Sequence, residues 1–554
     1  MAKGNIVHDA EFYIVEAQNE EAWNAEDQAL DARLAALRDK HGTKPNIIHI
    51  MWDDTAFGDI GIPALAAIRG FKTPNLDRMR DEGIMFSRMY TEPACTPSRA
   101  AAITGRHPFR YGMASVEWPL IFGGLSGEEK TTANVLSEQG YATAFYAKWH
   151  LGDIEESYPH NQGFDEALFL PYNQVSSIWG PMADMANASP GSGHMRPDNP
   201  HEIDEHGLRG DGFVVAMEGK KGEFTREWGK PDAETYGKVD FECEKRLTDF
   251  VARNAAAKKP FFASYWPNML SFIPSPEPKK TLNAGGLAEG LNRLDGFIGG
   301  LMDQLQELGI AENTLLVCMA DNGPMVHNAP GLLGMNETIF RGGKGDFLEG
   351  GVRVPAFAWW PGVIEPGQLV NDMIHEVDLY TTFARLGGGL DGVPTDRVVD
   401  GIDQTPLFMN GDAHGRRDWL FIYAGDELGA TVKGRYKRHW QSNEEGADTG
   451  VASVFYDLIT DPRELLPQLV PLIWQSGQWD RMLKRHEMWK EKYPNRPKAR
   501  GVAFAGIDNA RPETAAIGTN LAELRKRLPF DPLEAATGFE LPDKYKNLNT
   551  NAVD

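Results

Sequence analysis

Residues 45–54 read Pro-Asn-Ile-Ile-His-Ile-Met-Trp-Asp-Asp, a short, mostly apolar run that ends in two carboxylates. A run of this kind is typical of a strand buried on both faces of a parallel sheet. Three other runs end in polar side chains in the same way: YATAFYA (141–147) precedes Lys148 and His150, PFFASYW (260–266) precedes Asn268, and NTLLVCMA (313–320) precedes Asp321 and Asn322. Open α/β sheets bind ligands at the carboxyl ends of their strands, so we expect these side chains to meet at one edge.

The pattern around these runs predicts the domain organisation. From residue 45 to about 410, apolar runs alternate with helical segments, which indicates an α/β domain with a large, mixed, mostly parallel sheet sandwiched by helices. Residues 1–44 are expected to form a helical extension. Its apolar residues Trp23, Leu30, Leu34 and Leu37 lie on one face of the predicted helix, and Gly42 ends that helix. Residues 176–212 form an insertion loop in this interpretation, and residues 411–554 form a smaller α+β subdomain with a tail.

Composition and charge exclude several kinds of partner. The chain has 554 residues, with 56 Lys and Arg against 79 Asp and Glu, and a formal net charge of −23. This charge would repel nucleic acid and anionic membrane surfaces, and no run of basic residues offsets it. No apolar stretch has the length of a membrane helix, and the start of the chain lacks an apolar signal core. We therefore expect a cytoplasmic protein with neither nucleic acid nor membrane as a partner.

Cys95 begins the most informative segment, Cys-Thr-Pro-Ser-Arg-Ala-Ala-Ala-Ile-Thr-Gly (95–105). Pro97 suits the start of a helix and the alanines after Arg99 continue it, so Cys95 is expected just ahead of a helix N-terminus. The free N–H groups and positive dipole end found there stabilise an anionic nucleophile or a bound oxyanion. A helix-start cysteine with a surface arginine is the plainer interpretation. Cys243 and Cys318 are too scattered to build a disulfide scaffold or a thiolate metal cluster with it.

The whole string resembles the sulfatase signature C-x-P-S-R-x-x-x-x-T-G without a mismatch. Further matches follow in the order of that family: Asp53-Asp54, Lys148-Trp149-His150-Leu151-Gly152, Asp321-Asn322-Gly323, Arg341-Gly342-Gly343-Lys344-Gly345 and Glu349-Gly350-Gly351-Val352-Arg353-Val354-Pro355. Together they cover about residues 45–360. The resemblance implies an alkaline-phosphatase-like fold with residues 45–410 as the catalytic domain. It also implies a sulfuric ester hydrolase of the arylsulfatase type, acting on sulfate monoesters.

The acidic positions predict a metal site. Asp53, Asp54, Asp321 and Asn322 offer only oxygen ligands, which suit a hard divalent cation. Calcium is the first expectation, and Mn²⁺ or Mg²⁺ stays open. By resemblance, a formylglycine-generating enzyme converts Cys95 to formylglycine, and the modified side chain completes the metal shell. A solvated loop is the alternative for one Asp-Asp pair, but two polar pairs at strand ends favour a metal site.

The resemblance also assigns roles to four basic side chains. Arg99 and Lys148 hold the formylglycine oxygens, and Lys344 contacts the substrate sulfate. His150 takes the proton from the hydroxyl that remains when sulfate leaves. Fixed positive charges of this kind stabilise a dianionic transition state. Taken singly, each of these residues is more often a surface charge.

One position departs from the family. After the strand at 260–266 the family shows Pro-His, with the His as proton donor to the leaving oxygen, whereas this chain has Pro267-Asn268. Asparagine cannot act as a general acid, although Asn268 is still expected to line the substrate site. One possibility is that another group, such as Lys344 or a His of the 176–212 loop, donates the proton. The other is that the substrates, such as aryl sulfates, have leaving groups that need little protonation.

Two rival functions remain open. A phosphonate monoester or phosphodiester hydrolase of the same superfamily would share the formylglycine, the metal ligands and the fold. A non-catalytic metal-binding paralogue would keep an unmodified Cys95. The segment His201-Glu202-Ile203-Asp204-Glu205-His206 lacks the H-E-x-x-H spacing of zinc proteases, so we interpret it as a solvated loop. The expected partners are a small-molecule sulfate ester and the modifying enzyme, with a homo-oligomer open.

Overall fold

The computed structural model describes residues 6–117, 121–173, 216–229, 233–268, 285–326, 337–441, 454–468, 470–512 and 514–515. Its helices are α1 (Ala10–His41), α2 (Pro63–Arg69), α3 (Pro74–Asp81), α4 (Cys95–Thr104), α5 (Thr132–Ser137), α6 (Ala233–Ala257), α7 (Gly285–Glu307), α8 (Glu349–Val352), α9 (Val377–Leu386), α10 (Thr405–Asn410) and α11 (Val470–Lys492). Its strands are β1 (Asn46–Trp52), β2 (Ile84–Tyr90), β3 (Gly123–Gly124), β4 (Ala142–Lys148), β5 (Glu166–Leu170), β6 (Ala216–Lys220), β7 (Arg226–Trp228), β8 (Phe261–Trp266), β9 (Thr314–Ala320), β10 (Arg353–Trp359), β11 (Gln368–Val370), β12 (Ile374–His375), β13 (Trp419–Ala424), β14 (Glu427–Lys433), β15 (Tyr436–His439), β16 (Val454–Asp457) and β17 (Ala499–Arg500).

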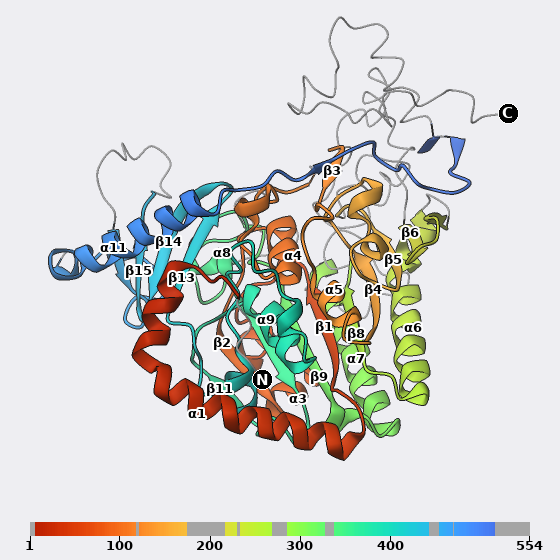
Figure 1. Ribbon diagram of the computed structural model, residues 1–554, viewed down its shortest axis with the longest axis horizontal. Coiled ribbons are helices and arrows are strands. Elements are labelled where there is room, and N and C mark those ends of the chain that lie inside the picture. The colour runs from red at the N-terminus through yellow and green to blue at the C-terminus, as the bar shows by residue number, and fades with distance from the viewer. Residues whose placement is uncertain are drawn as a thin grey trace, which may run out of the picture.

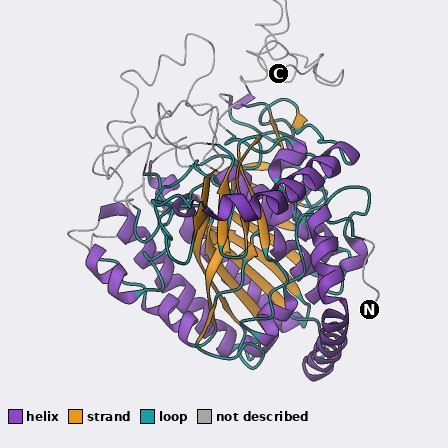
Figure 2. Ribbon diagram, turned by 90° about the vertical axis from the view of Figure 1, so that its left-hand side faces the viewer, coloured by secondary structure: helices purple, strands orange, loops and turns teal. Residues whose placement is uncertain are grey.

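An eleven-stranded sheet runs through the centre of the main domain (Figure 2). Its strands lie in the order β11-β2-β10-β9-β1-β8-β4-β5-β6-β7, and β12 pairs with β2. The strands β9, β1, β8, β4 and β5 are parallel neighbours, whereas β10 runs antiparallel to β9 and β6 antiparallel to β5. All seven residues of β1 are buried, as its apolar sequence predicts for a strand covered on both faces.

Two groups of helices cover this sheet. α7 contacts α3 and α6, and α9 contacts α4 and α5. Figure 2 shows helices on both sides of the strands. The core between the layers is rich in large aromatic side chains, among them Trp52, Phe145 and Trp266, which are buried. The sheet is therefore held from both sides by packed apolar layers.

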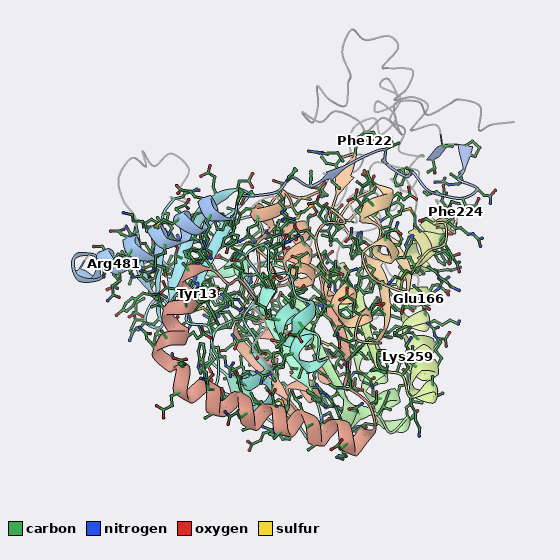
Figure 3. All side chains as sticks on the ribbon, in the orientation of Figure 1. Tyr13, Phe122, Glu166, Phe224, Lys259 and Arg481 are labelled. Atoms are coloured by element: carbon green, nitrogen blue, oxygen red, sulfur yellow. The ribbon has the colours of Figure 1, made fainter. Side chains whose placement is uncertain are left out.

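The helix α1 spans 32 residues and runs along the bottom of the molecule in Figure 1. Leu30 and Leu34 are buried, as the sequence stripe predicts, and Gly42 ends the helix with a left-handed φ of 70°. α1 contacts both α10 and α11. Tyr13, labelled in Figure 3, lies near the start of α1. Its ring centroid is 6.1 Å from that of Trp489 in α11. The N-terminal extension thus packs against the C-terminal part of the chain.

The C-terminal part contains a second, antiparallel sheet in the order β13-β14-β15-β16, with α11 against it. We call residues 494–508, which follow α11 and run along the top of the molecule in Figure 1, the C-terminal strap. This arrangement confirms the predicted fold class, a large mixed, mostly parallel sheet between helices with a smaller α+β unit. Within the described ranges, every helix is too short or too polar to cross a membrane.

Candidate active site

The carboxyl edge of the large sheet brings four oxygen-bearing side chains together. β1 and β9 pair along their full length, so Asp53 and Asp321, the residues that follow them, lie side by side. The Asp54 N–H donates to Asp321 Oδ1 over 3.1 Å, and Asn322 Nδ2 donates to Asp54 Oδ1 over 2.7 Å. All four side chains are buried. The structure therefore gathers the four predicted metal ligands in one cluster.

Tight backbone geometry holds this cluster in place. Asp54 has a φ of 45°, a left-handed conformation that is uncommon outside glycine. Next to Asn322, a Cβ on Gly323 would lie 1.8 Å from the carbonyl oxygen of Gly350. The Asp-Asn-Gly and Glu-Gly-Gly motifs therefore pack main chain against main chain, which explains the glycines in both. Local strain of the kind seen at Asp54 persists only where the surroundings enforce it, and it is concentrated at functional sites.

Two basic side chains bind Asp53. Arg99 Nη2 lies 2.5 Å from Asp53 Oδ1 and 2.9 Å from Asp321 Oδ2, and Lys148 Nζ lies 2.7 Å from Asp53 Oδ1. Burial alone would raise the pKa of Asp53, but the charges of Lys148 and Arg99 hold it well below its ordinary value. Burial and the charge of Asp53 raise the pKa of Asp321 well above its ordinary value. Further positive charge is needed before both carboxylates stay ionised.

Lys344 is the third basic side chain of the cluster. Its Nζ lies 2.7 Å from Asp54 Oδ1 and 3.0 Å from Asp54 Oδ2. Burial alone would lower the pKa of Lys344, but the charge of Asp54 raises it well above its ordinary value. The Gly345 N–H donates to the Pro93 carbonyl oxygen over 2.7 Å, which ties this loop to the segment before α4. The side chain of Lys344 therefore stays protonated, close enough to Cys95 for an electrostatic interaction between them.

Cys95 is the first residue of α4, one position further into the helix than the sequence indicated. It is a free, fully buried cysteine. Arg99 follows four residues later, so the two side chains share a helix face, which gives the spacing in the motif a physical reason. Gly105 ends α4 with a φ of 69°, and a Cβ there would lie 2.5 Å from the ring of Tyr380. The signature at 95–105 thus places the side chains of Cys95 and Arg99 on the same face of α4.

His150 follows β4 with a left-handed φ of 56°. Its Nε2 lies 2.9 Å from the Glu117 carbonyl oxygen, and its own carbonyl oxygen accepts from Thr96 Oγ1 over 3.1 Å. Burial and the charge of Lys148 lower the pKa of His150 well below its ordinary value, so the ring is neutral near pH 7. A neutral imidazole can accept a proton. The contact with Glu117 was not predicted, because a backbone carbonyl carries no residue-type signal.

Asn268 lies at the end of β8, which the sheet places between β1 and β4. It is buried, and its N–H donates to Asp240 Oδ1 over 3.0 Å. The guanidinium of Arg99 stacks over the ring of Trp266, 5.2 Å from its centroid, so this strand end adjoins Arg99. The structure therefore brings every predicted site residue to one edge, whereas their catalytic roles stay predictions. The 176–212 loop, with residues 201–206, lies outside the described residues.

A second group of possible ligands lies next to α4. Glu92, His107 and His375 are buried and each offers a ligand atom within 4.8 Å of the others. His107 Nδ1 lies 2.6 Å from Glu92 Oε1; burial alone would lower the pKa of His107, but Asp400 and Glu92 raise it. His375 Nδ1 accepts from the Val377 N–H over 3.3 Å, which leaves the ring proton on Nε2. We therefore interpret Glu92 and His107 as a buried hydrogen-bonded pair, with the His375 ring packed edge-on against the His107 ring.

Comparisons with known proteins agree with the geometry of the sheet edge. The sulfatase family profile matches residues 45–389, more than half of the chain. The chain belongs to the sulfatase family. It is 31% identical to N-acetylgalactosamine-6-sulfatase of Canis lupus familiaris over 455 residues, which cover 78% of this chain and 80% of the relative. It is 34% identical to human arylsulfatase A over 427 residues, which cover 74% and 77%.

Among solved structures, the PsFucS1 sulfatase from Pseudoalteromonas sp. superimposes on this sulfatase with a TM-score of 0.73 at 29% sequence identity. The match covers 86% of this chain and 96% of that chain. The predicted family and its alkaline-phosphatase-like fold are thereby confirmed, and the protein is a hydrolase of sulfate esters.

Membership of the sulfatase family implies a divalent cation and a formylglycine, and the residues present fit both. Three carboxylates and one amide face one another at the edge of the sheet. Asn322 Oδ1 is buried and has no hydrogen-bond partner among the described residues. A buried polar atom is costly unless something binds it, and a hard cation is a suitable ligand for an amide oxygen. Cys95 is the first residue of α4, where free backbone N–H groups and the positive end of the helix dipole favour a negatively charged side chain or ligand.

Proposed function

We propose that this sulfatase hydrolyses sulfate monoesters with a formylglycine made from Cys95, and that one Ca²⁺ ion binds beside it. The cation ligands in this proposal are Asp53, Asp54, Asp321 and Asn322. One observation carries the proposal: these four side chains and three lysine or arginine side chains converge on the first turn of α4. Oxygen-only ligands favour calcium, with Mn²⁺ and Mg²⁺ as the alternatives to be measured.

Each protein residue has a defined task in this proposal. When bound, the cation would supply positive charge for developing oxyanions, and the formylglycine, hydrated by water, would supply the nucleophilic hydroxyl. Arg99 and Lys148 orient the nucleophile, and Lys344 binds the sulfate. Because Arg99 and Lys148 are buried and Lys344 is only 14% exposed, each paired with a carboxylate, they need little rearrangement when negative charge develops. His150, which is neutral, accepts the proton of the hydroxyl that remains when sulfate leaves.

We propose aryl sulfates as the preferred substrates. The support is Asn268, which occupies the strand end where the family places a proton-donating histidine. Without a donor there, an alkoxide of high pKa leaves slowly, whereas an aryl oxide leaves with little protonation. Lys344 is a poor substitute, since its pKa lies well above the ordinary value and it holds its proton tightly.

A second candidate is an amino-sugar 6-sulfate. The observation that favours it is the name of several relatives, N-acetylgalactosamine-6-sulfatase, at 30–31% identity. The leaving group would then be a primary alkoxide, so this candidate requires a proton donor other than Asn268. The two candidates therefore differ in the slope of rate against the pKa of the leaving group.

The test is a series of substrates with one preparation of known formylglycine content. Mass spectrometry of the tryptic peptide with Cys95 is expected to show loss of the thiol sulfur and an aldehyde. The rate is expected to fall steeply as the leaving-group pKa rises, and Asn268→His is expected to raise rates on poor leaving groups, by roughly 10- to 100-fold. A matched series of phosphonate monoesters and phosphodiesters is expected to react more slowly.

Several outcomes would contradict this proposal. Full activity of a preparation that contains only unmodified Cys95 would rule out the formylglycine mechanism. A shallow slope in the wild type, together with turnover of N-acetylgalactosamine 6-sulfate, would replace aryl sulfates by the amino-sugar candidate. Faster turnover of phosphonate monoesters than of sulfates would make sulfate hydrolysis a side activity.

A further inference from the structure

The C-terminal strap lies against the segments that flank the active site. β17 in the strap pairs with β3, and the Gly501 N–H donates to the Phe122 carbonyl oxygen over 3.1 Å. Figure 3 shows Phe122 at the upper rim, beside the strap. Further along, the Phe504 N–H donates to the Asp153 carbonyl oxygen over 2.8 Å, three residues after His150. The strap is thus attached on both sides of the stretch that carries His150.

Glu117 is the link between the strap and His150. Its N–H donates to Thr96 Oγ1 over 3.0 Å, and its carbonyl oxygen lies 2.9 Å from His150 Nε2. Its carboxylate is buried and forms an ion pair with Lys498 of the strap. Glu117 Oε2 has no hydrogen-bond partner among the described residues. Lys498 is therefore the cation that compensates this buried charge within the described part of the chain.

The carbonyl of Glu117 decides which ring nitrogen of His150 carries the proton. A carbonyl oxygen can only accept, so Nε2 must donate to it. The neutral ring then has its lone pair on Nδ1, which is buried and has no partner among the described residues. Thr96 Oγ1 closes the same network, since it accepts from Glu117 and donates to the His150 carbonyl oxygen. Thr96 directly follows Cys95, so the network ties the ring to the nucleophile segment.

We propose that Lys498 and Glu117 are positioning residues that fix the Nε2–H tautomer of His150 and so present Nδ1 as the base. Without Lys498, the carboxylate of Glu117 would be a buried charge without compensation, which is strongly destabilising. The side chain would turn toward water and draw its own carbonyl away from Nε2. The ring would then be free to carry its proton on either nitrogen. The inference rests on the proposed role of His150 as the base.

The experiment uses full-length protein with and without formylglycine. Histidine-selective ¹⁵N labelling and long-range ¹H–¹⁵N spectra report the tautomer, and His150→Gln assigns the signals of His150. The variants are Lys498→Met and Glu117→Gln, with Lys498→Arg as the conservative rescue. Arg496→Met is the matched control, because Arg496 is on the same strap and pairs with the exposed residues Glu128 and Asp396. The tautomer is read on unmodified protein, and kcat and KM on modified protein.

We expect the wild type, Lys498→Arg and Arg496→Met to show one proton fixed on Nε2. In Lys498→Met and Glu117→Gln we expect that signal to be lost, kcat to fall about tenfold and KM to stay within about twofold, since a misplaced base loses part of its roughly 10²- to 10⁴-fold contribution. The double variant is expected to be no worse than either single variant, because the two residues act as one unit.

Two results would overturn the inference. One is an Nε2–H signal and a kcat in Lys498→Met and Glu117→Gln equal to those of the wild type. The other is a loss of kcat with the tautomer unchanged, which would make the ion pair a structural contact alone. The proposed function fails separately: if His150→Gln keeps full kcat, His150 is not the base. If His150→Gln is inactive while Lys498→Met and Glu117→Gln are unaffected, only the positioning role is wrong.

Discussion

The sheet edge contacts the Cys95 segment directly, whereas the C-terminal strap contacts it through Glu117, and the two use different kinds of contact. At the edge, Asp53 is bound by Arg99 and Lys148 through buried, charged side chains. Along the strap, many contacts are main-chain hydrogen bonds, and the ion pair of Lys498 with the buried Glu117 adds a charged contact next to His150. The charged side-chain contacts at the sheet edge depend on residue type, so one substitution there removes a functional group of the site. The main-chain contacts of the strap depend on the path of the chain, so substitutions there should act in smaller steps.

The largest effect is expected at the sheet edge. Asp321→Ala or Asp53→Ala should lower kcat/KM by about 10³-fold or more and remove the bound metal, because losing a carboxylate leaves a hard cation under-coordinated. Steady-state kinetics and elemental analysis of the same preparation test this expectation. Asp81→Ala is the control, since the Asp81 side chain is 66% exposed. Stoichiometric metal in both variants would show that other residues hold the ion.

An intermediate effect is expected at Asp153, where the edge and the strap meet. Its carboxylate accepts from Tyr172 Oη over 2.8 Å and from the Gly123 N–H over 3.2 Å. Burial raises the pKa of Asp153 to about 7. In the unfolded chain the pKa is about 3.9, so the folded protein binds this proton more tightly. The resulting contribution to stability is complete below about pH 4 and is lost as the pH rises toward 7.

Asp153→Asn removes this titration. Between pH 5 and pH 8 the wild type should therefore lose more stability than the variant does, with a difference of at most about 3 kcal/mol in the free energy of unfolding. Thermal unfolding at both pH values measures it. Asp81→Asn, which changes an exposed carboxylate, should follow the wild type. Parallel pH profiles for Asp153→Asn and the wild type would mean that Asp153 is charged throughout this range.

The smallest effect is expected at Tyr158, which contacts the strap at Ala505. Tyr158 is buried, and its Oη lies 3.3 Å from the carbonyl oxygens of both Asp153 and Ala505. Tyr158→Phe should cost about 1 kcal/mol, the usual net value of one hydrogen bond. Amide hydrogen exchange in residues 498–506 should then accelerate by roughly fivefold, with kcat little changed. Unchanged exchange across the strap would show that main-chain contacts alone hold it.

The sheet edge was predictable from sequence because the types of its residues indicate what they can bind. Apolar runs that end in Asp53, Lys148 or Asp321 predict buried parallel strands whose ends converge, and the structure has this arrangement. The signature at 95–105 predicts a helix start with Cys95, and the spacing to Arg99 follows from helical geometry. These predictions rest on local patterns of a few residues, repeated four times along the chain.

The strap was not predictable by the same reasoning. Glu117 acts through its carbonyl oxygen, which every residue type possesses. Lys498 is 381 positions away in sequence and stands in a Pro-rich stretch without a motif. Asp153 has a raised pKa because of the burial that the tertiary packing imposes. Long-range packing without residue-type preference leaves no signal in a single sequence.

The pairing of β1 with β9 also determines when the sheet edge can form during protein synthesis. Asp53 and Asp321 are 268 positions apart, and the edge that joins them cannot form before β9 has been synthesised. At about 5–20 residues per second, the ribosome needs roughly 10 to 50 s to cover that distance. Cys95, which is fully buried in the folded protein, is made near the start of this interval. An enzyme that modifies Cys95 would therefore have a window during synthesis, and the arrival of β9 would begin to close it.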